Sequence, residues 1–279
     1  HEAGLAISAG VAISGGGEAA GAGVAGFATN TQKRASKATI DNSNVNADTL
    51  TIDANSTKIA QAVSAGVAAG LGAQAGIGGA GSVVITEQLG TTRAWLRGGT
   101  TTADEVVVVS DRRQEANVAA GAVGIGTNVG VGIGLAVNII GGDSKALIGN
   151  DLDDNSDTAI TTVNADDVTV DADRVESVSS YAFGAGISAS TGIAAMINTT
   201  EYRGETRAAI HGYLDSTNLT TDIRGTDGSS AATNVKVNAQ EIQDADQWAL
   251  GIGVGTSVGV GAVANVVLGR SQVYSEVVG

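Results

Sequence analysis

The chain has 279 residues, of which 41 are glycine, and it contains no proline and no cysteine. The lack of cysteine excludes a disulfide framework and thiolate metal sites, and the net charge of −14 disfavours binding to nucleic acid and to anionic membranes. Hydrophobic residues make up 43% of the chain but only 3% are aromatic, so a core of small side chains must be thin. A thin core is typical of stacked repeats.

The chain begins with residues of alternating size. Leu5, Ile7, Val11 and Ile13 share one parity, with glycine, alanine and serine between them, and this period of two predicts a β-strand. We interpret residues 1–279 as one continuous array of repeat copies. The predicted copies are 2–43 (partial), 44–99, 100–162, 163–233 and 234–279 (partial).

Each later copy opens with a short strand of the form Asn-Ala-Asp-x-Val-x-Val-Asp-Ala. The openings begin at Asn46, Thr102, Asn164 and Asn238, at spacings of 56, 62 and 74 residues. A polar stretch and then a long glycine/aliphatic segment follow each opening, and the differences in length fall in polar loops. We therefore expect one common fold for every copy.

The longest uncharged segment tests whether the chain spans a membrane. Ala116 to Gly142 contains no charge over 27 residues, which is long enough for a membrane-spanning helix. However, Val131, Ile133 and Leu135 alternate with glycine, and this alternation predicts a strand. We expect no membrane span in this segment.

The glycine-rich segments define the expected fold class. A strand of 20 residues would extend for about 68 Å, whereas strands usually have about 5 to 6 residues. We therefore expect several short strands in each segment, and two to four coils or hairpin layers in each copy. The predicted fold is all-β, a repetitive β-solenoid (β-helix or stacked β-roll), with a flat sandwich as the alternative. Valine, isoleucine and leucine should point inward, and glycine faces should let the sheets approach closely.

An asparagine recurs near the end of the alternating segments. Stacked copies can align such residues into a ladder in which each amide bonds the next. Asparagine is also common where a strand closes at a turn, and both interpretations remain open. The candidate ladder residues are Asn30, Asn138, Asn198 and Asn265.

The repeat unit is clearest at Ala136–Ile148, followed by Val163–Ala172. It resembles the repeats of giant filamentous bacterial adhesins, of the leukotoxin-type and filamentous haemagglutinin-like autotransporter kinds. The resemblance implies export to the bacterial cell surface and an elongated β-solenoid shaft that serves attachment or cell–cell contact. The implied partners are neighbouring repeats of the parent protein and a host-cell, partner-cell or glycan surface.

One acidic loop is a candidate calcium site. Asp151, Asp153, Asp154 and Asp157 lie within seven residues, and clustered carboxylates suit Ca²⁺. The loop lacks the pattern of an EF-hand, and the chain lacks the nine-residue glycine/aspartate repeat of calcium-binding β-rolls. Calcium is the one cofactor that the sequence suggests.

A second acidic group has a simpler interpretation. Strand alternation places Asp167, Asp171 and Asp173 on one face, which we expect to be solvated. His211 lies in a polar stretch, where we expect it to face solvent as well.

No arrangement of residues predicts catalysis, and we expect the protein not to be an enzyme. The resemblance itself supplies no catalytic residues. The alternative is a carbohydrate-active β-helix enzyme, or a carbohydrate- or ligand-binding module that uses the inserted acidic loops.

Overall fold

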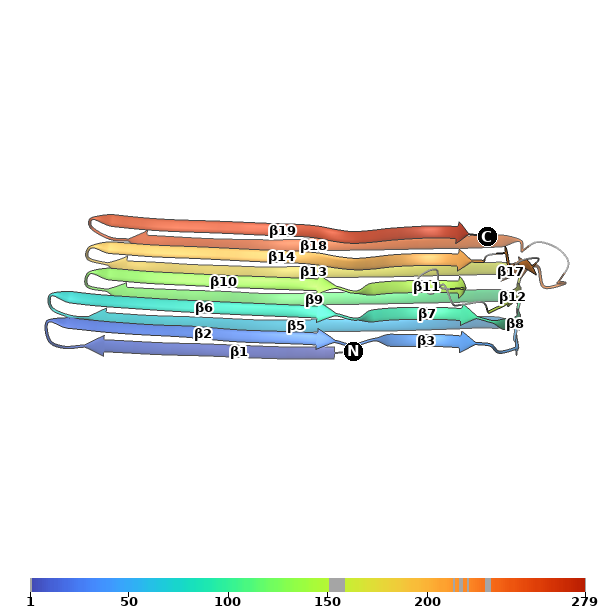
Figure 1. Cartoon of the computed structure of the whole chain (residues 1–279), viewed down its shortest axis with the longest axis horizontal. Helices are drawn as coiled ribbons and strands as arrows, with labels where there is room; N and C mark the ends of the chain where they lie inside the picture. The colour runs from blue at the N-terminus through green and yellow to red at the C-terminus, as the bar shows by residue number, and fades with distance from the viewer. Residues whose placement is uncertain are drawn as a thin grey trace.

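The computed structural model describes residues 2–150, 159–212, 214–215, 218–219, 221–228 and 232–278. These residues form β-strands joined by short turns, with no helix among them (Figure 1). The strand pairs are parallel except for the short pair β15 (Leu214–Asp215) and β16 (Asn218–Leu219). The prediction of an all-β chain is confirmed. No helix able to cross a membrane occurs in the described part of the chain.

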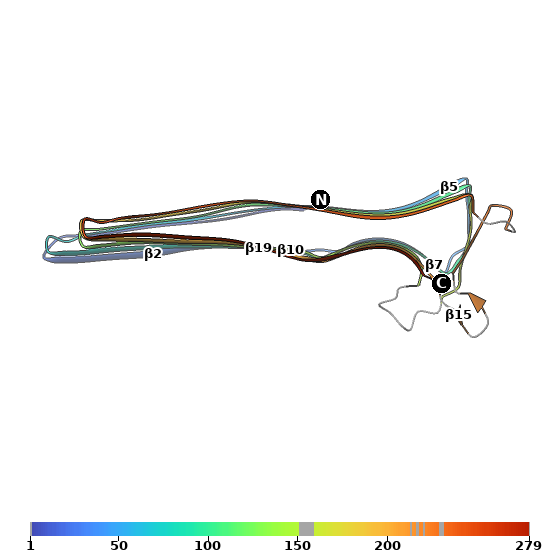
Figure 2. The same cartoon turned by 90° about the horizontal axis from the view of Figure 1, so that it is seen from above.

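The chain follows the same circuit again and again. In one circuit, β5 (Thr49–Leu71) runs along a first long sheet, and β6 (Ala75–Leu89) and β7 (Thr91–Arg97) return along a second. The short strand β8 (Gly99–Thr102) then closes the circuit and leads into the next long strand. Figure 2 shows the two long sheets close together at the narrow turn end and separated at the end where the short strands lie.

We call the first long sheet sheet A, the return sheet sheet B, and the short sheet the closing sheet. Sheet A contains β1 (Glu2–Gly15), β5, β9 (Glu105–Gly126), β13 (Asp167–Ser188) and β18 (Asn234–Val254). Sheet B contains β2 (Ala19–Lys33), β3 (Ser36–Asp41), β6, β7, β10 (Val129–Gly141), β11 (Asp143–Gly149), β14 (Thr191–His211) and β19 (Val258–Val278). The closing sheet contains β4 (Val45–Asn46), β8, β12 (Thr161–Asn164) and β17 (Thr221–Arg224).

The strands of sheet A are much longer than expected. β5 has 23 residues, and β9 and β13 have 22 each, so each extends for about 75 Å. One repeat therefore makes one wide circuit, and the prediction of several short strands and two to four coils per copy is wrong. Twist normally limits strand length, but these sheets are nearly flat (Figure 1). Their backbones pair in register from end to end, which keeps the long strands aligned.

The strand register corrects one repeat boundary. Asn46 pairs with Thr102, and Thr102 with Asn164, so these three openings are equivalent. The fourth opening is not at Asn238, because Asn238 pairs with Asp171. The step between these two circuits is therefore 67 residues instead of 74, and the error arose from matching Asn-Ala in the wrong register.

The two halves of each circuit have opposite side-chain arrangements. Near the closing sheet, large aliphatic side chains such as Ile52, Val108 and Val170 are buried between the sheets. Toward the turn end, the buried positions carry alanine, serine and glycine, while Ile13 and Leu71 lie exposed. The expectation that valine, isoleucine and leucine point inward is confirmed in the first half and wrong in the glycine-rich half.

The glycine-rich half inverts because its interior has no room for side chains. A Cβ added at Gly78 would lie 1.9 Å from the carbonyl oxygen of Ile125 in the facing sheet. A Cβ added at Gly124 would lie 2.0 Å from the carbonyl oxygen of Val131. The sheets thus come much closer than the about 10 Å between ordinary packed sheets, as the glycine pattern predicted. The large residues of the opposite parity must then face outward.

Candidate interaction surfaces

The outer face of sheet B in the glycine-rich half is apolar. We define the B-face as the outward positions of its five long strands, which are the alternate residues 21–29, 77–85, 129–137, 191–199 and 258–266. None of these positions carries a charge, and the first charged neighbours along the strands are Glu87 and Glu201. Ile77, Ile133 and Ile197 each expose about half of their surface. Such a large exposed apolar area on a soluble protein commonly marks a contact surface.

The relief of the B-face is uneven. β10 presents Val129, Val131, Ile133, Leu135 and Val137 as a ridge. On β2 and β6, in contrast, the outward positions Gly21, Gly23, Gly79 and Gly81 carry no side chain. A Cβ at Gly21 or Gly79 would meet no atom within 4 Å. A hollow therefore lies beside the ridge.

Sheet A has an apolar outer face at the same level. Four of its columns of paired residues carry no charge, and they begin at Ile7, Ala9, Val11 and Ile13. The aromatic residues Tyr181, Phe183 and Trp248 lie in two of these columns. Both outer surfaces of the glycine-rich half are therefore apolar, and its interior is not.

A buried polar band separates the two halves of the circuit. Lys58, Gln114 and Glu176 occupy one inward column of sheet A. Arg112 and Arg174 pair in the adjacent inward column, and all five side chains are almost completely buried. The band lies at the level where the large aliphatic residues change from inward to outward positions.

The cations of the band bond to backbone carbonyls of sheet B where its strands are interrupted. Gly90 and Gly142 have positive φ angles of 138° and 115°, a conformation that glycine adopts without strain. The Arg112 guanidinium donates to the Gly90 oxygen at 2.5 Å and to the Gly141 oxygen at 2.6 Å. Arg174 donates to the Gly142 oxygen at 2.6 Å. Charged donors thus satisfy carbonyls that the interrupted strands leave unpaired.

Burial shifts two of the charges in the band. Burial raises the pKa of Glu176 to about 7, although Arg174 and Arg112 oppose the shift. The Glu176 Oε1 atom lies 3.4 Å from the Arg174 Nε atom, and Arg174 is shared with Glu241. Burial and then the nearby Arg112 lower the pKa of Lys58 to about 8. Both shifts favour the neutral form, as expected for ionisable groups removed from water.

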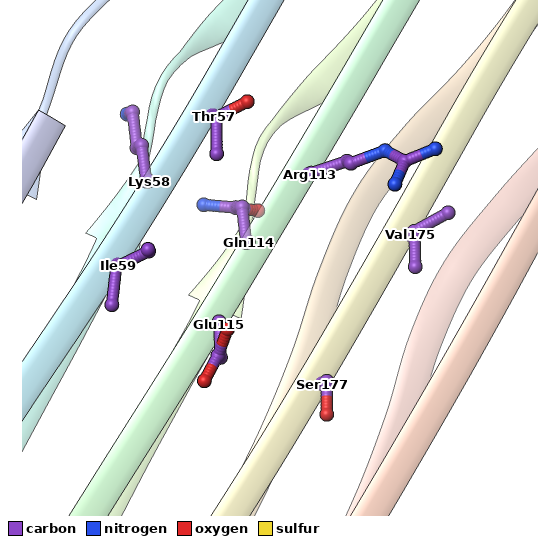
Figure 3. A pocket seen from close by; sticks show the side chains of 8 residues that line it. All are labelled: Thr57, Lys58, Ile59, Arg113, Gln114, Glu115, Val175 and Ser177. Carbon is purple, nitrogen blue, oxygen red and sulfur yellow. The ribbon is translucent and has the colours of Figure 1, made fainter. Parts of the chain in front are cut away.

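A shallow depression lies on the outer surface of sheet A beside the band (Figure 3). Its outward side chains come from three adjacent strands, with Thr57 on β5, Arg113 and Glu115 on β9, and Ser177 on β13 (Figure 3). Glu115 is the one carboxylate among the residues that line it, and none of them is aromatic. Two carboxylates are needed for the usual glycosidase mechanism, and the depression does not supply them.

The four candidate asparagines do not form one ladder. Asn30 and Asn138 share a column, but Thr86 lies between them. Asn198 and Asn265 pair directly in a different column. The Asn138 Nδ2 atom donates to the Ser180 hydroxyl at 3.0 Å, and Asn198 bonds both the hydroxyl and the carbonyl of the same serine. These amides therefore bridge sheet B to sheet A.

The environment of His211 differs from the prediction. It is 1% exposed instead of solvent-facing. Its Nδ1 atom lies 3.2 Å from the Asn150 carbonyl oxygen, and its Nε2 atom lies 3.1 Å from the Glu276 carboxylate. The sequence gave no signal for this burial, because the polar residues around His211 in the chain do not identify its partners in neighbouring circuits.

The acidic residues near β13 follow the predicted alternation. Asp167, Asp171 and Asp173 occupy outward positions, and Asp173 pairs in register with Asp111. Burial raises the pKa of Asp173, and the like charges of Asp171 and Asp111 raise it further. No group of three or more metal-ligating side chains occurs within the described ranges. The candidate calcium ligands Asp151, Asp153, Asp154 and Asp157 lie outside the described residues.

Comparisons with protein-family models, with curated proteins and with solved structures find no match to this chain. The surfaces described above are therefore interpreted from their own geometry and chemistry.

Proposed function

We propose that this chain is a β-solenoid segment of the shaft of a large adhesin on the bacterial cell surface. In this role it supports attachment or cell–cell contact mechanically and catalyses no reaction. The observation that carries the proposal is the in-register parallel pairing of successive circuits along their full length. Such stacking lets a chain grow by adding equivalent circuits, each stabilised by its neighbours.

The two open edges support this role. β1 pairs only with β5, and β18 pairs only with β13. The outer edges of β1 and β18 thus present long rows of backbone donors and acceptors without a strand partner in the described chain. Further repeats of the parent protein are the natural partners for these edges, because an open edge otherwise promotes association.

The dimensions indicate how such a shaft would be built. Each circuit adds about 4.8 Å along the stacking direction, whereas a single strand of sheet A extends for about 75 Å. The long axis of this segment therefore lies along its strands (Figure 1). A long shaft needs many circuits, and this segment alone is a broad slab.

Sedimentation and electron microscopy of the purified protein test the stacking. We expect mass to increase with concentration, and we expect particles to lengthen perpendicular to the strands while keeping their width. A protein that stays monomeric at high concentration would contradict stacking through the open edges.

Cellular location is tested separately. Antibodies raised against the purified protein should label intact source cells as strongly as permeabilised ones. Labelling that requires permeabilisation would exclude the proposed surface role.

The alternative is a carbohydrate-active enzyme or a ligand-binding module that uses the acidic loop 151–157. Deleting residues 151–157 should leave folding unchanged if the protein is a shaft. Loss of glycan or calcium binding after this deletion would favour the alternative.

A further inference from the structure

The B-face is large enough to form a stable interface. Its strands are spaced by about 4.8 Å, and about nine to ten residues of each strand contribute, so it measures about 24 Å by 33 Å, or roughly 800 Å². A specific protein–protein interface buries about 800 Å² on each partner. The absence of charge across these positions removes the desolvation cost that usually opposes face-to-face packing.

The relief of the B-face selects its partner. Across the sheet, Val131 is level with Gly79, and Ile133 is level with Gly81. A two-fold axis parallel to the strands, midway between β6 and β10, would place β10 of one copy over β6 of the other. Ile133 would then lie over the partner's Gly81, and Val131 over its Gly79. The same rotation would place Ile193 of β14 over Gly23 of β2, because these two residues share one level.

We propose that the B-face binds the B-face of a second copy of this chain through this two-fold axis, with the ridge of each copy in the hollow of the other. An isologous contact requires a surface that is complementary to itself, and the ridge and hollow lie side by side on one flat face (Figure 1). This lateral contact is independent of the proposed stacking through the open edges, so either can fail alone.

Two leucine substitutions separate this proposal from general hydrophobic adhesion. Gly79→Leu fills the hollow and should weaken the lateral dimer about tenfold or more, because overpacking a fitted contact is unfavourable. Gly121→Leu is the matched control, since Gly121 faces outward on sheet A and its Cβ would also meet no atom within 4 Å. Far-UV circular dichroism and the guanidinium midpoint of each variant should match those of the unsubstituted protein.

Sedimentation equilibrium of the full chain, at concentrations below those that cause stacking, measures the dimer. The proposal predicts a weaker dimer for Gly79→Leu, an unchanged dimer for Gly121→Leu, and no dimer for Ile133→Asp. Equal or stronger association of Gly79→Leu would overturn it, because added apolar area strengthens a nonspecific contact. A monomeric protein that binds phosphatidylcholine vesicles through the B-face would also overturn it, and would identify a lipid surface as the occupant.

Discussion

At the residue scale, the buried Glu176 couples stability to pH. Its pKa rises from 4.5 in the unfolded chain to about 7 in the fold because it is buried. Between these pH values the folded state holds a proton that the unfolded state has lost, so stability falls as pH rises from about 4.5 to 7. The buried carboxylate thus costs stability at neutral and higher pH, where the fold must hold its charge.

Glu176→Gln should remove this cost. We expect the variant to be more stable than the unsubstituted protein at pH 8, by about 3 kcal/mol at most. At pH 4 the two proteins should be nearly equal, because Glu176 is then protonated in both states. Guanidinium unfolding at both pH values measures the difference, and an equal gain at pH 4 would show that the cause is packing and not charge.

Sequence reasoning at this scale succeeded where local alternation decides the environment. The outward positions of Asp167, Asp171 and Asp173 follow directly from strand parity. The burial of His211 and the bonds of Asn138 and Asn198 to Ser180 depend on contacts between circuits. Such contacts cannot be located before the strand register is known.

At the element scale, the alternate glycines of β6 have different roles although they are adjacent in sequence. Gly78 points inward, where a Cβ would lie 1.9 Å from the backbone of the facing sheet. Gly79 points outward into open space. The pair therefore separates the need for close sheet packing from the general effect of glycine on strand stability.

Gly78→Ala should destabilise the protein by about 1 to 3 kcal/mol or more, because the sheets must separate to admit the methyl group. Gly79→Ala should be neutral or stabilising by up to about 1 kcal/mol, because alanine reduces the entropy of the unfolded chain. Thermal or guanidinium unfolding of the two variants measures the difference. Equal effects of the two substitutions would contradict the narrow interior.

The strand period and the close approach of glycine faces could be read from the sequence, but the direction of the large residues could not. Alternation identifies two faces of a strand and does not say which face is inside. In β5, Ile52 and Val67 have opposite parity, and this change of parity was the available signal. Strand length was misjudged because flat sheets in continuous register are uncommon.

At the scale of the whole molecule, the fold offers two directions of assembly. The open edges of β1 and β18 favour growth along the stacking direction, and the B-face favours lateral pairing of slabs. Together these contacts would thicken a shaft as it lengthens. The polar half near the closing sheet, with outward residues such as Asp53 and Asp171, would stay solvated.

The stack of one circuit per repeat is the feature on which the interpretation of every surface depends. Because the chain has no cysteine, spin labels can be attached at Thr51→Cys and Thr169→Cys without background. Both residues pair with Val107, one on each side of β9, so their backbones lie about 10 Å apart. Continuous-wave electron paramagnetic resonance of the double variant should show strong dipolar broadening that is absent from each single variant. A spectrum equal to the sum of the single-variant spectra would place several coils between these residues and contradict the fold.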